Sequence, residues 1–119
     1  MTDTLRIAII ILEPIGGDMS RAYRGLKTAL EFQKAGDDVA VLFDGSGVET
    51  LAAISDSGSP LNPLITALRD SVLGACSFCA TSHKVADAIL DAGWALRAEN
   101  DGEASVRDLL VEGRQILTF

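Results

Sequence analysis

Apolar residues in this chain gather in short runs that polar and glycine-containing segments separate. The first run, Leu5 to Leu12, is rich in isoleucine and almost unbroken, which is typical of a strand covered on both faces in a parallel sheet. A segment with apolar residues at helical spacing follows and ends near Gly36, and a second apolar run extends from Val39 to Phe43. This strand–helix–strand order predicts an α/β fold with right-handed crossovers.

The rest of the chain predicts shorter elements. Helices are expected over residues 47–54, 64–71, 77–92 and 104–111, with a break in the third of these near Val85. Strands are expected over residues 72–75, 94–97 and 115–119, and the Ser-, Gly- and Pro-containing segment 55–63 is expected to form an exposed loop. No repeat, low-complexity tract or linker interrupts the series. We therefore expect a single domain over residues 1–119.

Composition and charge exclude several classes of function. Apolar residues make up 48% of the chain, which indicates a globular protein. The formal net charge of −7 opposes binding to nucleic acid or to an anionic membrane, so neither is an expected partner. No apolar segment approaches the roughly eighteen residues of a membrane helix, and the first apolar run is too short for a signal peptide. We therefore expect a cytoplasmic protein.

The two cysteines, Cys76 and Cys79, are the main candidates for chemistry. In a reducing cytosol a close pair is more often catalytic, redox-active or metal-binding than a structural disulfide. Cys76 is expected where a strand ends and a helix begins, at the carboxyl edge of the sheet, where sites of α/β proteins form. Free N–H groups at the helix start are expected to lower the pKa of the Cys76 thiol below its reference value of about 8.5. A thiolate there suits a nucleophile or a sulfur carrier.

Each candidate residue also has a purely structural interpretation. Cys76 can simply fill the core, and Cys79 is either a resolving thiol or a small helix residue. His83 is either a base beside the thiol or, as the polar neighbours Lys84 and Asp87 favour, a solvated side chain. Two cysteines and one histidine cannot supply the four ligands of a structural zinc site, and no nucleotide-binding motif is present. No metal or cofactor is therefore expected.

Longer motifs make the chain resemble the DsrE/DsrF-like family, the DsrE/TusD-like sulfur-relay proteins. The motifs are RIAIIILEPIGGDMSRA near the start, VLFDGSGV after the second strand, LGACSFCA around the cysteines and VEGRQILTF at the end. No single motif is diagnostic, and their order and spacing carry the resemblance. The chain departs from the commoner family pattern at Ser82-His83-Lys84, where an aromatic residue and a glycine are expected.

The resemblance implies a three-layer α/β/α sandwich with a five-stranded, mainly parallel sheet. It implies assembly into a homo-oligomer, either a trimer or a hexamer, and an exchange of sulfur with donor or acceptor proteins. Family members that relay sulfur use a cysteine after the third strand, which corresponds to Cys76 here. Relatives with a second cysteine three residues later match Cys79.

Three hypotheses of function follow from these observations. The first is a sulfur carrier or sulfurtransferase subunit that holds sulfur as a persulfide on Cys76. The second is a thiol–disulfide oxidoreductase that uses Cys76 and Cys79 together. The third is a noncatalytic oligomeric binding protein that keeps only the fold. The spacing of the two cysteines does not separate the first two hypotheses.

Overall fold

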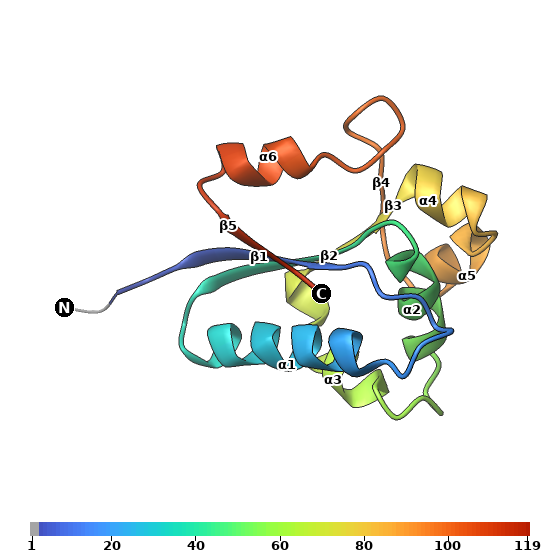
Figure 1. Cartoon of the computed structure of the whole chain (residues 1–119), viewed down its shortest axis with the longest axis horizontal. Helices are drawn as coiled ribbons and strands as arrows, with labels where there is room; N and C mark the ends of the chain where they lie inside the picture. Colours follow the sequence, from blue (N-terminus) through green and yellow to red (C-terminus); the bar gives the residue numbers. More distant parts are fainter. Residues whose placement is uncertain (1–2) are drawn as a thin grey trace.

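A five-stranded sheet runs through the computed structural model, which describes residues 3–119 (Figure 1). The strands lie in the order β4-β3-β2-β1-β5, and every neighbouring pair is parallel. The predicted α/β class is confirmed, and the expected mainly parallel sheet is all parallel. The strands are β1 (Arg6–Ile11), β2 (Asp38–Phe43), β3 (Val72–Cys76), β4 (Leu96–Arg97) and β5 (Gln115–Thr118).

Helices flank the sheet on both faces (Figure 1). α1 and α3 lie on one face and α6 lies on the other, while α2, α4 and α5 gather toward the end where the strands finish. The helices are α1 (Ser20–Lys34), α2 (Gly47–Ile54), α3 (Asn62–Ala67), α4 (Ser77–Ser82), α5 (Ala86–Asp91) and α6 (Val106–Val111). The group at the carboxyl end of the sheet surrounds the two cysteines.

The core is divided between the two faces by the alternation of side chains along each strand. Ile7, Ile9 and Ile11 of β1 belong to the larger cluster, which includes residues of α1 and α2. Ile10 points to the other face and packs with Leu109 of α6 in a smaller cluster. Burial on both faces explains why the first strand is apolar at nearly every position.

Three of the predicted helices differ in detail from the structure, and one of them, expected over residues 104–111, is α6 and begins two residues later, at Val106. The helix expected over residues 64–71 is α3, which begins two residues earlier and is followed by a 3-10 turn, Arg69–Ser71. Pro63 allows the earlier start, because proline is tolerated in the first turn of a helix, where its missing N–H is not needed. The helix expected over residues 77–92 is divided into α4 and α5, and the predicted break near Val85 is confirmed.

The strand expected over residues 94–97 is shorter than predicted, since only Leu96 and Arg97 pair with β3. Trp94 is instead part of the core, 6% exposed, and its indole N–H donates a hydrogen bond to Ser55 Oγ at 2.7 Å. Burial of this large side chain, rather than strand pairing, therefore fixes the start of the segment.

Gly74 determines how β3 reaches its last residue. The register between β2 and β3 shifts between Val41 and Leu42, where β3 carries one extra residue, and the φ of Gly74 is +119°. A Cβ atom at this position would collide with the backbone carbonyl of Ala95. Only glycine fits such a bulge without strain. The bulge lies two residues before Cys76 and so helps to set where that side chain lies.

Candidate functional site

Cys76 lies buried at the carboxyl end of β3. It is the last residue of the strand, and α4 begins at the next residue, so the predicted strand-to-helix position is confirmed. Its partner in the sheet is Arg97 of β4. Only 1% of Cys76 is exposed. The residue therefore occupies the expected edge of the sheet and is at the same time packed as a core residue.

Asp44, which follows the neighbouring strand, joins the two cysteines. Because β2 lies beside β3, the residue after Phe43 reaches the same edge of the sheet as Cys76. One carboxylate oxygen and the two sulfur atoms all lie within 4.8 Å of one another. The Cys79 thiol donates a hydrogen bond to Asp44 Oδ1 at 3.7 Å, and the N–H of Gly45 donates to the same oxygen at 2.8 Å. We call these three side chains, Asp44, Cys76 and Cys79, the sulfur cluster.

The backbone group that contacts Cys76 Sγ comes from an unexpected element. The N–H of Ala104, between β4 and α6, donates to this sulfur at 3.4 Å. The sequence predicted that the first-turn amides of the following helix would do so. One of those amides, the N–H of Phe78, instead donates to the carbonyl of Gly102 at 3.1 Å. The segment between β4 and α6 thus supplies the polar contact to the sulfur and is itself held against α4.

Cys79 is half-buried, and its environment opposes ionisation. Burial, together with the adjacent Cys76 sulfur and the Asp44 carboxylate, raises the pKa of the Cys79 thiol to about 12, while the N–H of Gly45 acts in the opposite direction. Cys79 is therefore protonated at neutral pH. This agrees with its role as the hydrogen-bond donor to Asp44.

His83 lies outside the sulfur cluster. Its Nδ1 atom is 2.7 Å from Glu49 Oε2 of α2, and 30% of the His83 side chain is exposed. The side chain is thus partly solvated, as expected, and in addition contacts Glu49. The alternative, in which His83 is a base beside a thiol, gains no support. The imidazole contacts the carboxylate of Glu49, and His83 is not one of the three side chains of the sulfur cluster.

The sequence analysis missed Asp44, Glu49 and Ala104. A signal for Asp44 was present, because it directly follows a buried strand, as Cys76 ends one, and adjacent parallel strands end at the same edge. No comparable signal exists for Ala104, whose contribution is a backbone amide. Its position depends on the course of an irregular segment, which a residue pattern does not encode.

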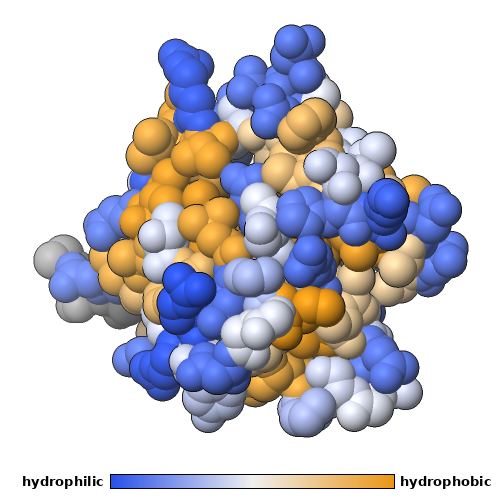
Figure 2. All heavy atoms as spheres, turned by 45° about the vertical axis from the view of Figure 1, so that its right-hand side comes forward, coloured by the Kyte–Doolittle hydropathy of each residue, from blue (hydrophilic) through white to orange (hydrophobic). Residues whose placement is uncertain are grey.

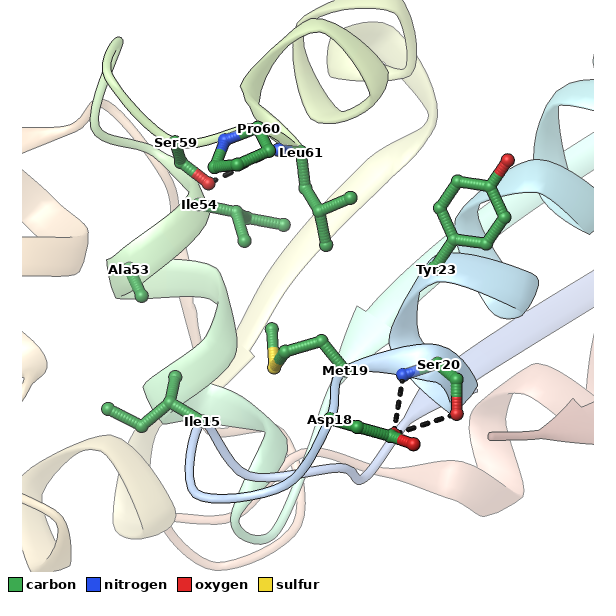
Figure 3. Close-up of a pocket in the computed structure, with 10 residues that line it drawn as sticks. All are labelled: Ile15, Asp18, Met19, Ser20, Tyr23, Ala53, Ile54, Ser59, Pro60 and Leu61. Atoms are coloured by element: carbon green, nitrogen blue, oxygen red, sulfur yellow. Dashed lines mark hydrogen bonds between the residues drawn. The ribbon is translucent and has the colours of Figure 1, made fainter.

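A cavity on the same side of the sheet as α1 is separate from the cysteines. It has a volume of about 560 Å³ and lies between the start of α1 and the connection from α2 to α3 (Figure 3). A second hollow of about 440 Å³ shares Ile15 and Ala53 with it and extends to His83 and Glu49. Neither lining includes a cysteine. The sulfur cluster therefore lies outside both of these hollows.

These features define a class: an α/β protein with a parallel sheet and a pair of cysteines at its carboxyl edge. The model of the DsrE/DsrF-like family matches residues 6–119. The chain therefore belongs to the DsrE/DsrF-like family, which is associated with sulfur relay. Searches among curated proteins and among solved structures gave no match. Within residues 3–119, no helix has the length and apolar character needed to cross a membrane.

Proposed function

We propose that this chain is a sulfur-relay protein that carries sulfur as a persulfide on Cys76. The observation that carries the proposal is the position of Cys76 at the carboxyl end of β3, with the N–H of Ala104 donating to its sulfur. An amide dipole directed at sulfur favours negative charge there, whether on a thiolate or on a persulfide. Family membership supports sulfur, rather than another group, as the cargo.

The transfer step needs no redox partner. The Cys76 thiolate attacks the outer sulfur of a donor persulfide, R–S–S–H, and a new S–S bond forms as the donor's own S–S bond breaks. The donor leaves as a thiolate, and the hydrogen remains on the transferred sulfur. An acceptor thiolate then removes that sulfur from Cys76 by the same reaction. We propose that donor and acceptor are proteins of the cytoplasm.

Cys79 supports a relay because it is poorly suited to break the persulfide. If Cys79 attacked the inner sulfur of a Cys76 persulfide, a disulfide would form and sulfide would be lost. A thiol with a pKa of about 12 is ionised in only about one molecule in 10⁵ at pH 7. The Cys76 persulfide should therefore persist until it meets its acceptor.

Access to Cys76 requires a local opening of the wall around it. The residue is 1% exposed, whereas Asp44 and Cys79 are each half-buried. The side of the sulfur cluster formed by these two residues is thus one route from solvent to the buried sulfur. α4 has only six residues, and a short helix at the surface is a unit that opens at low free energy.

A thiol–disulfide oxidoreductase is the second candidate, and one observation favours it. The two sulfur atoms lie within 4.8 Å of each other at the start of a helix, so a small movement would bring them to bonding distance. In this case Cys79 would act as the resolving thiol in spite of its raised pKa.

Sulfur transfer by cysteine variants separates the candidates. Reduced, chelator-treated protein is loaded with a low-molecular-weight persulfide and mixed with an acceptor thiol. The relay predicts that Cys76→Ser abolishes transfer and that Cys79→Ser, the matched control, reduces it only in part. Equal loss in both variants would favour the oxidoreductase. Transfer that is indifferent to both substitutions would contradict both candidates and favour the noncatalytic binding protein.

A further inference from the structure

The sulfur cluster also has the composition of a metal site. The argument against zinc from the sequence counted two cysteines and His83, but His83 pairs with Glu49 instead. Asp44 takes the place of the histidine as the third donor. Two thiols and one carboxylate, all from one chain, match the three protein ligands of an open zinc site, in which the fourth position holds an exchangeable group.

The distances within the sulfur cluster suit a tetrahedral zinc ion. Zinc–sulfur bonds of about 2.3 Å and zinc–oxygen bonds of about 2.0 Å place two sulfurs about 3.8 Å apart, and sulfur and oxygen about 3.5 Å apart. The Cys79 Sγ to Asp44 Oδ1 distance is 3.7 Å, and no donor pair is more than 4.8 Å apart. To share one ion, the sulfur–sulfur pair therefore needs to approach by at most about 1.0 Å and a sulfur–oxygen pair by at most about 1.3 Å.

The surroundings of the three donors are those of an outer coordination shell. The N–H of Gly45 orients the Asp44 carboxylate, and the N–H of Ala104 donates to Cys76 Sγ, as groups behind metal ligands commonly do. No ion pair within residues 3–119 involves Asp44, so no Lys, Arg or His side chain there neutralises this carboxylate. A bound cation would supply the missing positive charge.

We propose that Asp44, Cys76 and Cys79 bind one zinc ion per chain, with a fourth position open to an exchangeable ligand. Two thiolates favour a borderline-soft cation, and the carboxylate favours zinc over copper(I). Solvent reaches the ion past the half-buried Asp44 and Cys79. Each cysteine loses its thiol proton on binding, so zinc uptake releases protons. The bound ion and the persulfide compete for Cys76, so zinc loading protects that sulfur from modification.

Cadmium, which resembles zinc and gives an ultraviolet charge-transfer band with thiolates, is the probe. Titration of reduced, metal-free protein with Cd²⁺ should give one equivalent per chain and the band of two thiolates. Cys79→Ser should halve the intensity of the band. Asp44→Asn should leave the intensity unchanged but lower the affinity for Cd²⁺ by at least about tenfold, since even changes in the outer shell of a metal site cause a loss of this size. Asp91→Asn, which removes an exposed carboxylate of α5, should change neither quantity.

Wild-type protein provides a measurement that does not depend on the folding of a variant. X-ray absorption of the zinc-loaded chain should show two sulfur neighbours at about 2.3 Å and oxygen neighbours at about 2.0 Å. Half an equivalent of metal per chain, fewer than two sulfur neighbours, or a full band in Cys76→Ser would overturn the proposal. Sulfur transfer is assayed in the presence of chelator, so the two experiments are independent. A failure to bind zinc would not contradict the sulfur relay, and a failure to relay sulfur would not contradict zinc binding.

Discussion

At the scale of single residues, the site depends on a few positions whose backbone or side chain meets another element. Asp44 belongs to the sulfur cluster because β2 and β3 are neighbours. Cys76 is positioned by the bulge at Gly74, and Ala104 contributes only its N–H. The residues that form the site are therefore also residues that pack the fold, and a change in packing at Gly74 should alter the position of the Cys76 sulfur.

Gly74→Ala should destabilise the fold by about 2 kcal/mol or more. The φ of +119° is unfavourable for alanine, and the added Cβ would meet the carbonyl of Ala95, a backbone atom that cannot easily move. Urea unfolding measures the change. Gly16→Ala is the control, because a Cβ there has nothing within 4 Å, and its stability should stay within about 0.5 kcal/mol of wild type. Equal stability of the two variants would mean that β3 accommodates the bulge without glycine.

At the scale of elements, α4 is the movable part of the site. Cys79 holds it to Asp44, and His83 at its end holds it to Glu49, so two contacts join α4 to the β2–α2 segment. The N–H of Phe78 joins the same helix to the segment after β4. Opening of this helix is the step that our account requires before a donor reaches Cys76.

His83→Ala should loosen α4 without unfolding the protein. A partly exposed contact of this kind contributes about 0.4–1 kcal/mol, so Cys76 should be alkylated about two- to fivefold faster in the folded state. Global stability should fall by no more than about 1 kcal/mol. The rate is followed by mass spectrometry of the Cys76 peptide. Asp38→Asn, which breaks an ion pair at the start of β2, should leave the rate unchanged, and an unchanged rate in His83→Ala would show that α4 does not control access.

The elements also show what the sequence could predict. The first two strands and the helices at residues 20–34 and 47–54 follow from apolar periodicity, because each buries a continuous apolar face. The strand end at Cys76 follows in the same way. The shortening of β4 could not be predicted, because it depends on a hydrogen bond between Trp94 and Ser55, which lie far apart in the sequence. The pairing of His83 with Glu49 is likewise a contact between distant segments.

At the scale of the whole molecule, the sheet has two ends with different roles. The carboxyl end holds the sulfur cluster. The amino end is held by Arg114, whose side chain is 9% exposed and donates hydrogen bonds to the Ile7 carbonyl at 3.3 Å and to Asp38 Oδ1 at 3.1 Å. Arg6 pairs with the same carboxylate at 3.1 Å. These contacts join the amino ends of β1 and β2 to the residue before β5.

This charged group makes stability depend on pH. Hydrogen bonding from Arg114, aided by Arg6, lowers the pKa of Asp38 from its ordinary value of 3.8. Asp38 therefore stabilises the fold above that value, and the stabilisation is lost as the pH falls through the lower folded-state pKa. Asp38→Asn should cost less than about 1 kcal/mol at pH 7, since Asp38 is largely exposed. In urea unfolding, the difference from wild type should shrink as the pH falls below 3.8 and disappear once the pH is below the folded-state pKa of Asp38. A deficit that persists there would indicate lost packing rather than lost charge.

Apolar side chains exposed on the surface favour association between copies of this chain. Figure 2 shows apolar side chains in several patches on one face, and the exposed apolar residues of the chain include Phe78 at 60%, Leu110 at 58% and Val111 at 67%. Association would cover such surface. Together with the family resemblance, this predicts a homotrimer or homohexamer. Light scattering at micromolar concentration and physiological salt should give the mass of three or six chains, and the mass of a single chain would contradict the prediction.

The location of sulfur after loading tests the central claim most directly. Reduced, metal-free protein is exposed to a persulfide donor, alkylated at low pH under denaturing conditions, digested and analysed by mass spectrometry. Because the two cysteines are only three positions apart in the sequence, proteolysis must cut between them, or fragmentation must assign the sulfur within one peptide. We predict one added sulfur atom on Cys76 and no added sulfur on Cys79. Sulfur found on Cys79 alone, or a Cys76–Cys79 disulfide with no added sulfur, would contradict this prediction.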